Sequence, residues 1–216
     1  MKRLGLLVIC ALYIGGVVSV SQAGVIPLSG QSLTDLLGVS HQPVGTLLET
    51  DMNNGNLLAE AHSRAYTDGA GLYAYLYQVH NVGEPGNAAI EMLTLCPFTG
   101  ADDFTSLGWL TGDDFPGEFS SGGQDAETDA FVDVLSTGPE ISFYFAKKAG
   151  KSIDVGEHSV VLYVMSDLEP DQIIGNVING SVASGPVVGP VPEPATIGML
   201  LCGAVMIVKR RRRRRA

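Results

Sequence analysis

The sequence lacks the residue patterns that mark most enzymes. Cysteine occurs 3 times, tryptophan once and histidine 4 times in 216 residues. No GxSxG frame surrounds a serine, no HxxxH or HxH spacing joins two histidines, and no GxGxxG follows a strand-like run. These patterns carry serine nucleophiles, zinc ligands and dinucleotide phosphates. Their absence argues against a hydrolase, a zinc enzyme and a dinucleotide-dependent enzyme, so we expect a protein that is not an enzyme.

The scarcity of cysteine also excludes a disulfide within the middle of the chain. Cys10 and Cys202 lie in the apolar segments near the two ends, which leaves Cys96 alone between them. A single cysteine in an exported protein can pair with a second chain. Burial as a small hydrophobic residue is the more common outcome.

Positive charge is nearly absent between the two ends. All 23 acidic residues fall between Asp35 and Glu193, whereas the basic residues in this interval are Arg64, Lys147, Lys148 and Lys151. Such a balance repels nucleic-acid phosphates, so we expect no nucleic acid as a partner. It favours solubility, and it permits divalent cations or cationic partners.

The last 26 residues combine three features in a fixed order. A triplet of Pro192, Glu193 and Pro194 comes first, and an apolar run from Ala195 to Val208 follows it. The chain then ends in a basic cluster that consists of Lys209, Arg210, Arg211, Arg212, Arg213, Arg214 and Arg215. Arginines in a block cannot pack in a core, but beside a bilayer they stay on the cytoplasmic side, attracted by anionic lipid.

The apolar run is short for a membrane-spanning helix. At a rise of 1.5 Å per residue it reaches about 21 Å, against a hydrocarbon core of about 30 Å. Local thinning of the bilayer and snorkelling of the Lys and Arg stems can cover this deficit. We therefore expect a short transmembrane helix over 195–208 and a cytoplasmic tail over 209–216. The less favoured alternative is an interfacial or buried helix.

This ordered set resembles the PEP-CTERM sorting signal of Gram-negative, biofilm-forming bacteria, which an exosortase processes. Each feature is weak by itself, and the three in order at the extreme C-terminus are specific. The resemblance implies a transient anchor in the inner membrane that is cut near Pro192, Glu193 and Pro194. It also implies an exosortase and the Sec export machinery as partners, and a final location at the cell surface or in the extracellular matrix.

The first residues agree with export. Lys2 and Arg3 form a positive start, an apolar stretch runs from Leu4 to Val20, and small residues precede Gly24. This pattern predicts a signal peptide over 1–23 with cleavage between Ala23 and Gly24. An uncleaved N-terminal anchor is the alternative.

Between the ends, alternating apolar residues and frequent turn residues predict one all-β domain over 24–184. Leu72 to Asn81 is the clearest strand, and its apolar residues on both faces predict a central position in a sheet. The other expected strands are 45–52, 57–67, 88–96, 104–110, 130–135, 140–146, 157–165 and 173–184. Eight or nine short strands predict an antiparallel β-sandwich. One short helix or turn is expected over 32–38.

The run from Gly185 to Pro194, GPVVGPVPEP, is rich in proline and glycine. This composition predicts an extended linker between the domain and the membrane.

One segment is acidic beyond the average of the chain. Nine carboxylates fall between Asp102 and Asp133 without a Lys or Arg, among several glycines. Ca²⁺ takes six to eight oxygen ligands from flexible loops, which makes this a candidate calcium site. The residues singled out are Asp113, Asp114, Asp125, Glu127 and Asp129. The spacing is not that of an EF-hand, and the alternative is a solvated acidic loop.

The single tryptophan and two of the histidines each allow two interpretations. Trp109 lies in the acidic region, where its ring could stack on a sugar, although core packing is favoured. His62 and His80 fall on strands that could be neighbours, so a pair is conceivable. Without metal-ligand spacing, ordinary surface or hydrogen-bonded histidines are favoured, and a zinc site is not predicted.

Two functional classes follow from these observations. The favoured one is a non-enzymatic surface or matrix protein that is exported, briefly anchored and processed. The alternative is a Ca²⁺-dependent carbohydrate-binding module of the extracellular polysaccharide layer. The acidic segment distinguishes them, because only the binding module needs its carboxylates.

Overall fold

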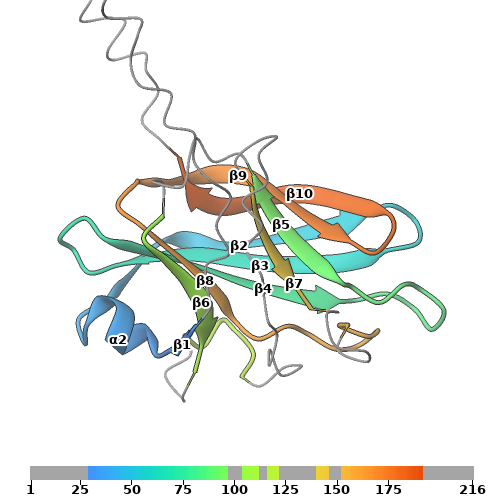
Figure 1. Ribbon diagram of the computed structural model, residues 1–216, viewed down its shortest axis with the longest axis horizontal. Helices are drawn as coiled ribbons and strands as arrows, with labels where there is room; N and C mark the ends of the chain where they lie inside the picture. Colours follow the sequence, from blue (N-terminus) through green and yellow to red (C-terminus); the bar gives the residue numbers. More distant parts are fainter. Residues whose placement is uncertain (1–28, 97–103, 112–115, 122–139, 146–151, 192–216) are drawn as a thin grey trace, which may run out of the picture.

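The computed structural model describes residues 29–96, 104–111, 116–121, 140–145 and 152–191. These residues form two β-sheets and one short helix (Figure 1). The first sheet has six strands in the order β1-β6-β8-β4-β3-β2, and the second has four in the order β10-β9-β5-β7. The elements are β1 (Ser29–Gln31), α2 (Leu33–Leu37), β2 (Gln42–Asn53), β3 (Leu58–Thr67), β4 (Tyr73–Asn81), β5 (Met92–Cys96), β6 (Ser106–Leu110), β7 (Ile141–Tyr144), β8 (Leu162–Ser166), β9 (Pro170–Ile178) and β10 (Val182–Pro190).

The two sheets enclose the main hydrophobic core. Strand β4 lies between β3 and β8, so the prediction of a central strand is confirmed. Its residues Tyr75, Tyr77 and Val79 are buried in the cluster that the two sheets share, together with Phe143 and Val177 of the second sheet. The strict alternation of side chains along a strand explains why every second residue faces this core.

The other face of the six-stranded sheet carries a smaller apolar cluster at one end. Ala74 and Leu76 of β4 belong to it, with Leu33 and Leu37 of helix α2. The helix begins with a capping box in which the amide of Asp35 donates to Ser32 Oγ at 3.1 Å. This capping box provides hydrogen-bond acceptors for free backbone amides of the first turn. The expectation of a short helix at 32–38 is confirmed.

The last strand of the domain was predicted wrongly. The expected strand over 173–184 is a hairpin of β9 and β10, and the expected linker from Gly185 is part of β10 as far as Pro190. Strand β10 is an edge strand, where proline is tolerated because one side needs no ladder hydrogen bond.

The glycines of this hairpin have a packing role instead of a linker role. A Cβ on Gly175 would lie 3.0 Å from Met52 Cε, and a Cβ on Gly185 would overlap Thr50, and both of these neighbours belong to the opposite sheet. Glycine therefore lets the two sheets approach closely at this point.

Two other details of the predicted fold differ. Strand β1 pairs parallel with β6, so the six-stranded sheet is mixed and not wholly antiparallel. The described residues contain ten strands, because β1 was not expected and the hairpin was taken as one strand. The strand expected over 130–135 lies outside the described residues. Within the described part of the chain, no helix is long and apolar enough to cross a membrane, and the segment 195–208 is not among these residues.

Candidate functional site

Most of the residues singled out from the sequence lie outside the described part of the chain. This holds for the Pro-Glu-Pro triplet, the basic cluster, the Ala23 and Gly24 cleavage position, and the five candidate calcium ligands. Their roles stay predictions. One member of the acidic segment, Glu118, is described, and its carboxylate is bound to Arg64.

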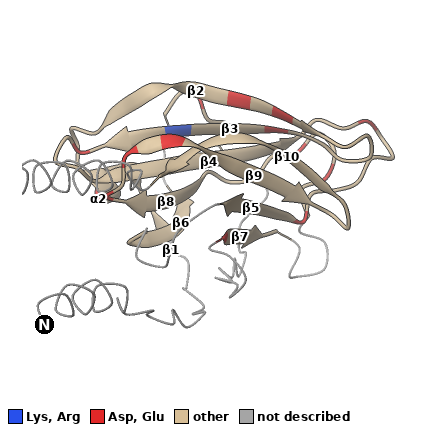
Figure 2. Ribbon diagram, turned by 90° about the horizontal axis from the view of Figure 1, so that it is seen from above, with Lys and Arg blue, Asp and Glu red and all other residues tan. Residues whose placement is uncertain are grey.

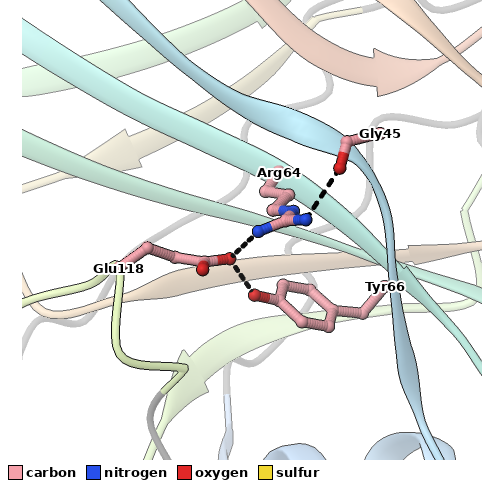
Figure 3. A network of polar contacts seen from close by, with 4 residues as sticks. All are labelled: Gly45, Arg64, Tyr66 and Glu118. Carbon is pink, nitrogen blue, oxygen red and sulfur yellow. Dashed lines mark hydrogen bonds and ion pairs between the residues drawn. The ribbon is translucent and has the colours of Figure 1, made fainter.

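Arg64, Tyr66 and Glu118 form a polar network (Figure 3). It lies on the outer face of the six-stranded sheet, turned away from the second sheet, because Tyr66 belongs to the smaller apolar cluster while its neighbour Ala65 belongs to the main core. Arg64 Nη1 lies 2.6 Å from Glu118 Oε1, and the Tyr66 hydroxyl donates to the same oxygen. Arg64 Nη2 donates to the carbonyl of Gly45 at 2.7 Å. Gly45 lies in the irregular stretch of β2 between Val44 and Leu48, which turns its carbonyl toward the guanidinium.

This network fixes the segment 116–121 against the sheet. The side chains of Arg64 and Glu118 are only 18% and 25% exposed, so their ion pair is partly shielded from water. Burial, and then the hydrogen bond to Glu118, raise the pKa of Tyr66 well above 10. Its hydroxyl therefore stays a hydrogen-bond donor at neutral pH. Arg64 is also the one Lys or Arg of the described residues, visible as the blue segment on β3 in Figure 2.

Three of the four histidines meet on the same outer face. We call His62, His80 and His158 the histidine row. The ring centres of His62 and His80 are 4.6 Å apart, and those of His80 and His158 are 5.2 Å apart. Strand register produces this row, because His62 lies opposite Gln78, two residues before His80, and His80 pairs with His158 in an isolated bridge.

Carboxylates flank one end of the row. Glu49 on β2 lies opposite His62 on β3. Glu60 on β3 lies opposite His80 on β4. The Nε2 of His62 lies 2.9 Å from Glu60 Oε1. Ligand atoms of Glu49, Glu60 and His62 lie within 4.8 Å of one another, and Figure 2 shows acidic segments along β2 and β3.

The middle imidazole of the row is neutral at physiological pH. Burial, and then the neighbouring His62 and His158, lower the pKa of His80 to about 4 from its usual 6.5. Burial opposes the charged form of the ring, and two adjacent imidazoles oppose it further. His80 therefore keeps a lone pair at pH 7.

The described chain ends beside the sorting triplet. Strand β10 ends at Pro190, and the amide of Val191 donates to the carbonyl of Glu169 at 3.2 Å. Val191 also packs against the main core. A family model described as the PEP-CTERM protein-sorting motif matches residues 190–215.

The chain carries a PEP-CTERM sorting motif. The resemblance noted from the three ordered features is thereby confirmed, and the motif supports a secreted protein that is sorted through an exosortase. Searches for similar curated proteins and for similar solved structures found no match.

The PEP-CTERM motif begins at Pro190, the last residue of β10. The segment between the domain and the motif is therefore shorter than the linker expected from the sequence. The sequence indicates two members of the histidine row, because His62 and His80 fall on strands that could be neighbours. It does not indicate His158. The alternation of β3 and β4 could have placed the first two on one face, but no local signal joins His158 to them.

Trp109 and Cys96 are both partly buried. Trp109 is partly buried and packs against the main core, in keeping with the favoured interpretation. Cys96 is a half-buried free thiol at the end of β5, 3.6 Å from the amide nitrogen of the Asn176 side chain. The favoured expectation of burial is thus met in part, and pairing of Cys96 with a second chain stays the alternative.

Proposed function

We propose that this protein is a non-enzymatic cell-surface or extracellular-matrix protein that an exosortase cleaves at its PEP-CTERM motif. Export would begin with a Sec signal peptide that is cut between Ala23 and Gly24. The segment 195–208 would then hold the chain transiently in the inner membrane, with the basic cluster on the cytoplasmic side. Cleavage near Pro192, Glu193 and Pro194 would release the two-sheet domain.

The observation that carries this proposal is the match of the sorting motif to residues 190–215. Its position supports the proposal further. The matched segment begins where β10 ends, so cleavage after Val191 would leave both sheets complete.

The deciding experiment is the intact mass of the exported product from a host with an exosortase and from the same host without one. We expect a product that starts at Gly24 and has lost the arginines only when the exosortase is present. A variant in which Pro192, Glu193 and Pro194 are all replaced by alanine is the matched control, and it should keep its tail. A product that retains the arginines in both hosts would mean that the tail is a plain membrane anchor.

A second experiment tests the short distance between domain and motif. Because Val191 is tied to Glu169 and packs on the core, the residues before the triplet are held by the fold. A Gly-Ser spacer inserted between Val191 and Pro192 should therefore speed processing. An unchanged rate would show that the domain does not restrict access.

The Ca²⁺-dependent carbohydrate-binding module remains the alternative function. It predicts that Asp113→Asn or Asp125→Asn removes binding of Ca²⁺ and of matrix polysaccharide together. The favoured function predicts that neither variant changes either measurement. Glu118 is not expected to be a calcium ligand, because its carboxylate already accepts from Arg64 and Tyr66.

A further inference from the structure

We propose that the outer face of the six-stranded sheet binds a divalent transition-metal ion of the Zn²⁺ class through His62, His80 and the carboxylate of Glu49, while Glu60 orients His62. This site is separate from the sorting motif, and it is carried by strands β2, β3 and β4. The side chains come from three neighbouring strands whose register is fixed by continuous pairing. Sites built on strands hold their ligands more rigidly than sites built on loops.

Two ring nitrogens carry the proposal. His62 Nδ1 and His80 Nε2 are buried, and neither has a hydrogen-bond partner within the described part of the chain. A buried polar atom without a partner destabilises the fold, so a ligand that pairs with it is favoured. The two rings are in contact at 4.6 Å between centres, and one ion binds both nitrogens once the His80 ring rotates toward His62 and Glu49.

The tautomer of His62 suits this role. Its Nε2 lies 2.9 Å from Glu60 Oε1, an acceptor, so Nε2 carries the proton and Nδ1 keeps its lone pair. Histidines that bind metals usually donate the second ring N–H to a carboxylate or carbonyl, which fixes the ring. Glu60 holds His62 in this manner.

The carboxylates provide negative charge and an entry route. Glu49 is exposed and the Glu60 side chain is 34% exposed, whereas His62 is 16% exposed. Ligand atoms around one Zn²⁺ ion lie about 2 Å from it, hence at most about 4 Å apart. Ligand atoms of Glu49 and His62 lie within 4.8 Å of each other, so a small movement of the exposed Glu49 side chain brings them to this limit. The nearest described cation, Arg64, is neutralised by Glu118.

The donor types select the class of ion. Imidazole nitrogen with carboxylate oxygen suits Zn²⁺, Cu²⁺ and Ni²⁺, whereas Ca²⁺ takes oxygen ligands almost throughout. The proposed site is therefore different in chemistry from the calcium site considered for the acidic segment.

The test is calorimetric titration of the full-length chain, purified in mild detergent, with ZnCl₂ and with CaCl₂. We expect Zn²⁺ to bind with one equivalent at this site, and excess Ca²⁺ to leave that binding unchanged. His62→Gln and His80→Gln should each weaken Zn²⁺ binding at least about tenfold. His41→Gln is the matched control, since His41 lies outside the row, 2.9 Å from the carbonyl of Gly38, and it should bind as the wild type does.

Two further measurements keep the result interpretable if a histidine variant folds poorly. Glu49→Gln changes an exposed side chain and should weaken Zn²⁺ binding without changing the thermal midpoint of the unliganded protein. With Cu²⁺, electron paramagnetic resonance should show coupling to imidazole nitrogens that His41→Gln retains. Zn²⁺ affinity that is equal in the wild type, His62→Gln, His80→Gln and Glu49→Gln would overturn the proposal, as would a Cu²⁺ spectrum without nitrogen coupling.

Discussion

Gly185 of β10 lies directly against Thr50 of β2, close enough that a Cβ on the glycine would overlap the threonine methyl group. The two residues belong to different sheets, and the Thr50 hydroxyl donates to the carbonyl of Pro186 at 2.7 Å. This contact joins the strand that precedes the sorting motif to the far edge of the six-stranded sheet.

Replacing Gly185 by alanine should destabilise the domain. The added methyl group meets Thr50 and then Met52, so the two sheets must separate or side chains must leave their rotamers, at a cost of about 1–3 kcal/mol. Urea unfolding followed by tryptophan fluorescence measures the change. Gly117→Ala is the matched control, because nothing lies within 4 Å of the position of its Cβ. Equal unfolding midpoints for the two variants would contradict the close approach of the sheets.

Replacing Ser63 by alanine should loosen β10 locally. The Ser63 hydroxyl is fully buried and accepts from the amide of Val188 at 2.9 Å. Its loss leaves that amide without its side-chain acceptor, which costs about 1–3 kcal/mol. Hydrogen exchange should show faster exchange at Val188, while amides in the centre of β4 change only as much as global stability does. Protection at Val188 equal to that of the wild type would rule out this bond.

Replacing Glu118 by glutamine should weaken the network with Arg64 and Tyr66. A partly buried guanidinium then loses its counter-charge, and we expect a loss of about 1–3 kcal/mol in the free energy of unfolding. Because Glu118 is one cause of the raised pKa of Tyr66, the pKa of that hydroxyl should also fall. Ultraviolet titration of tyrosine ionisation detects this change. Tyr66→Phe serves as the control, since it removes the titrating group and leaves the ion pair.

Replacing Tyr77 by phenylalanine should leave stability at pH 7 unchanged or raise it. The Tyr77 hydroxyl is buried and has no hydrogen-bond partner among the described residues, so its removal abolishes a desolvation cost. Urea unfolding at pH 7 provides the measurement. A loss above about 1 kcal/mol would show that the hydroxyl has a partner.

Tyr77 should also make the free energy of unfolding depend on pH in alkaline solution. Burial, and then the neighbouring Tyr75, raise the pKa of Tyr77 well above 10.0. Above pH 10 the unfolded chain loses this proton while the folded chain keeps it, so stability falls as pH rises. Each such tyrosine contributes up to about 1.4 kcal/mol per pH unit. Between pH 8 and pH 11, Tyr77→Phe should therefore lose less stability than the wild type.

Much of the local structure could be predicted from local patterns. The alternation in Tyr73–Asn81 indicated a strand with two apolar faces, and β4 is central in its sheet. Ser32 and Asp35 have the spacing of a capping box, and a helix starts there. These features depend on residues a few positions apart, for which side-chain period and hydrogen-bonding chemistry suffice. The sorting motif is of this kind too, since its three features are contiguous.

Only the tertiary structure decided which distant segments meet. The proline and glycine content of Gly185–Pro190 is the same in a linker and in an edge strand, and contact with Thr50 and Ser63 makes it β10. The contact of His80 with His158 and the pairing of Arg64 with Glu118 depend on strand order and register across 78 and 54 residues of chain. Local composition does not encode such partners, because the free energy that selects them comes from packing one complete sheet against another.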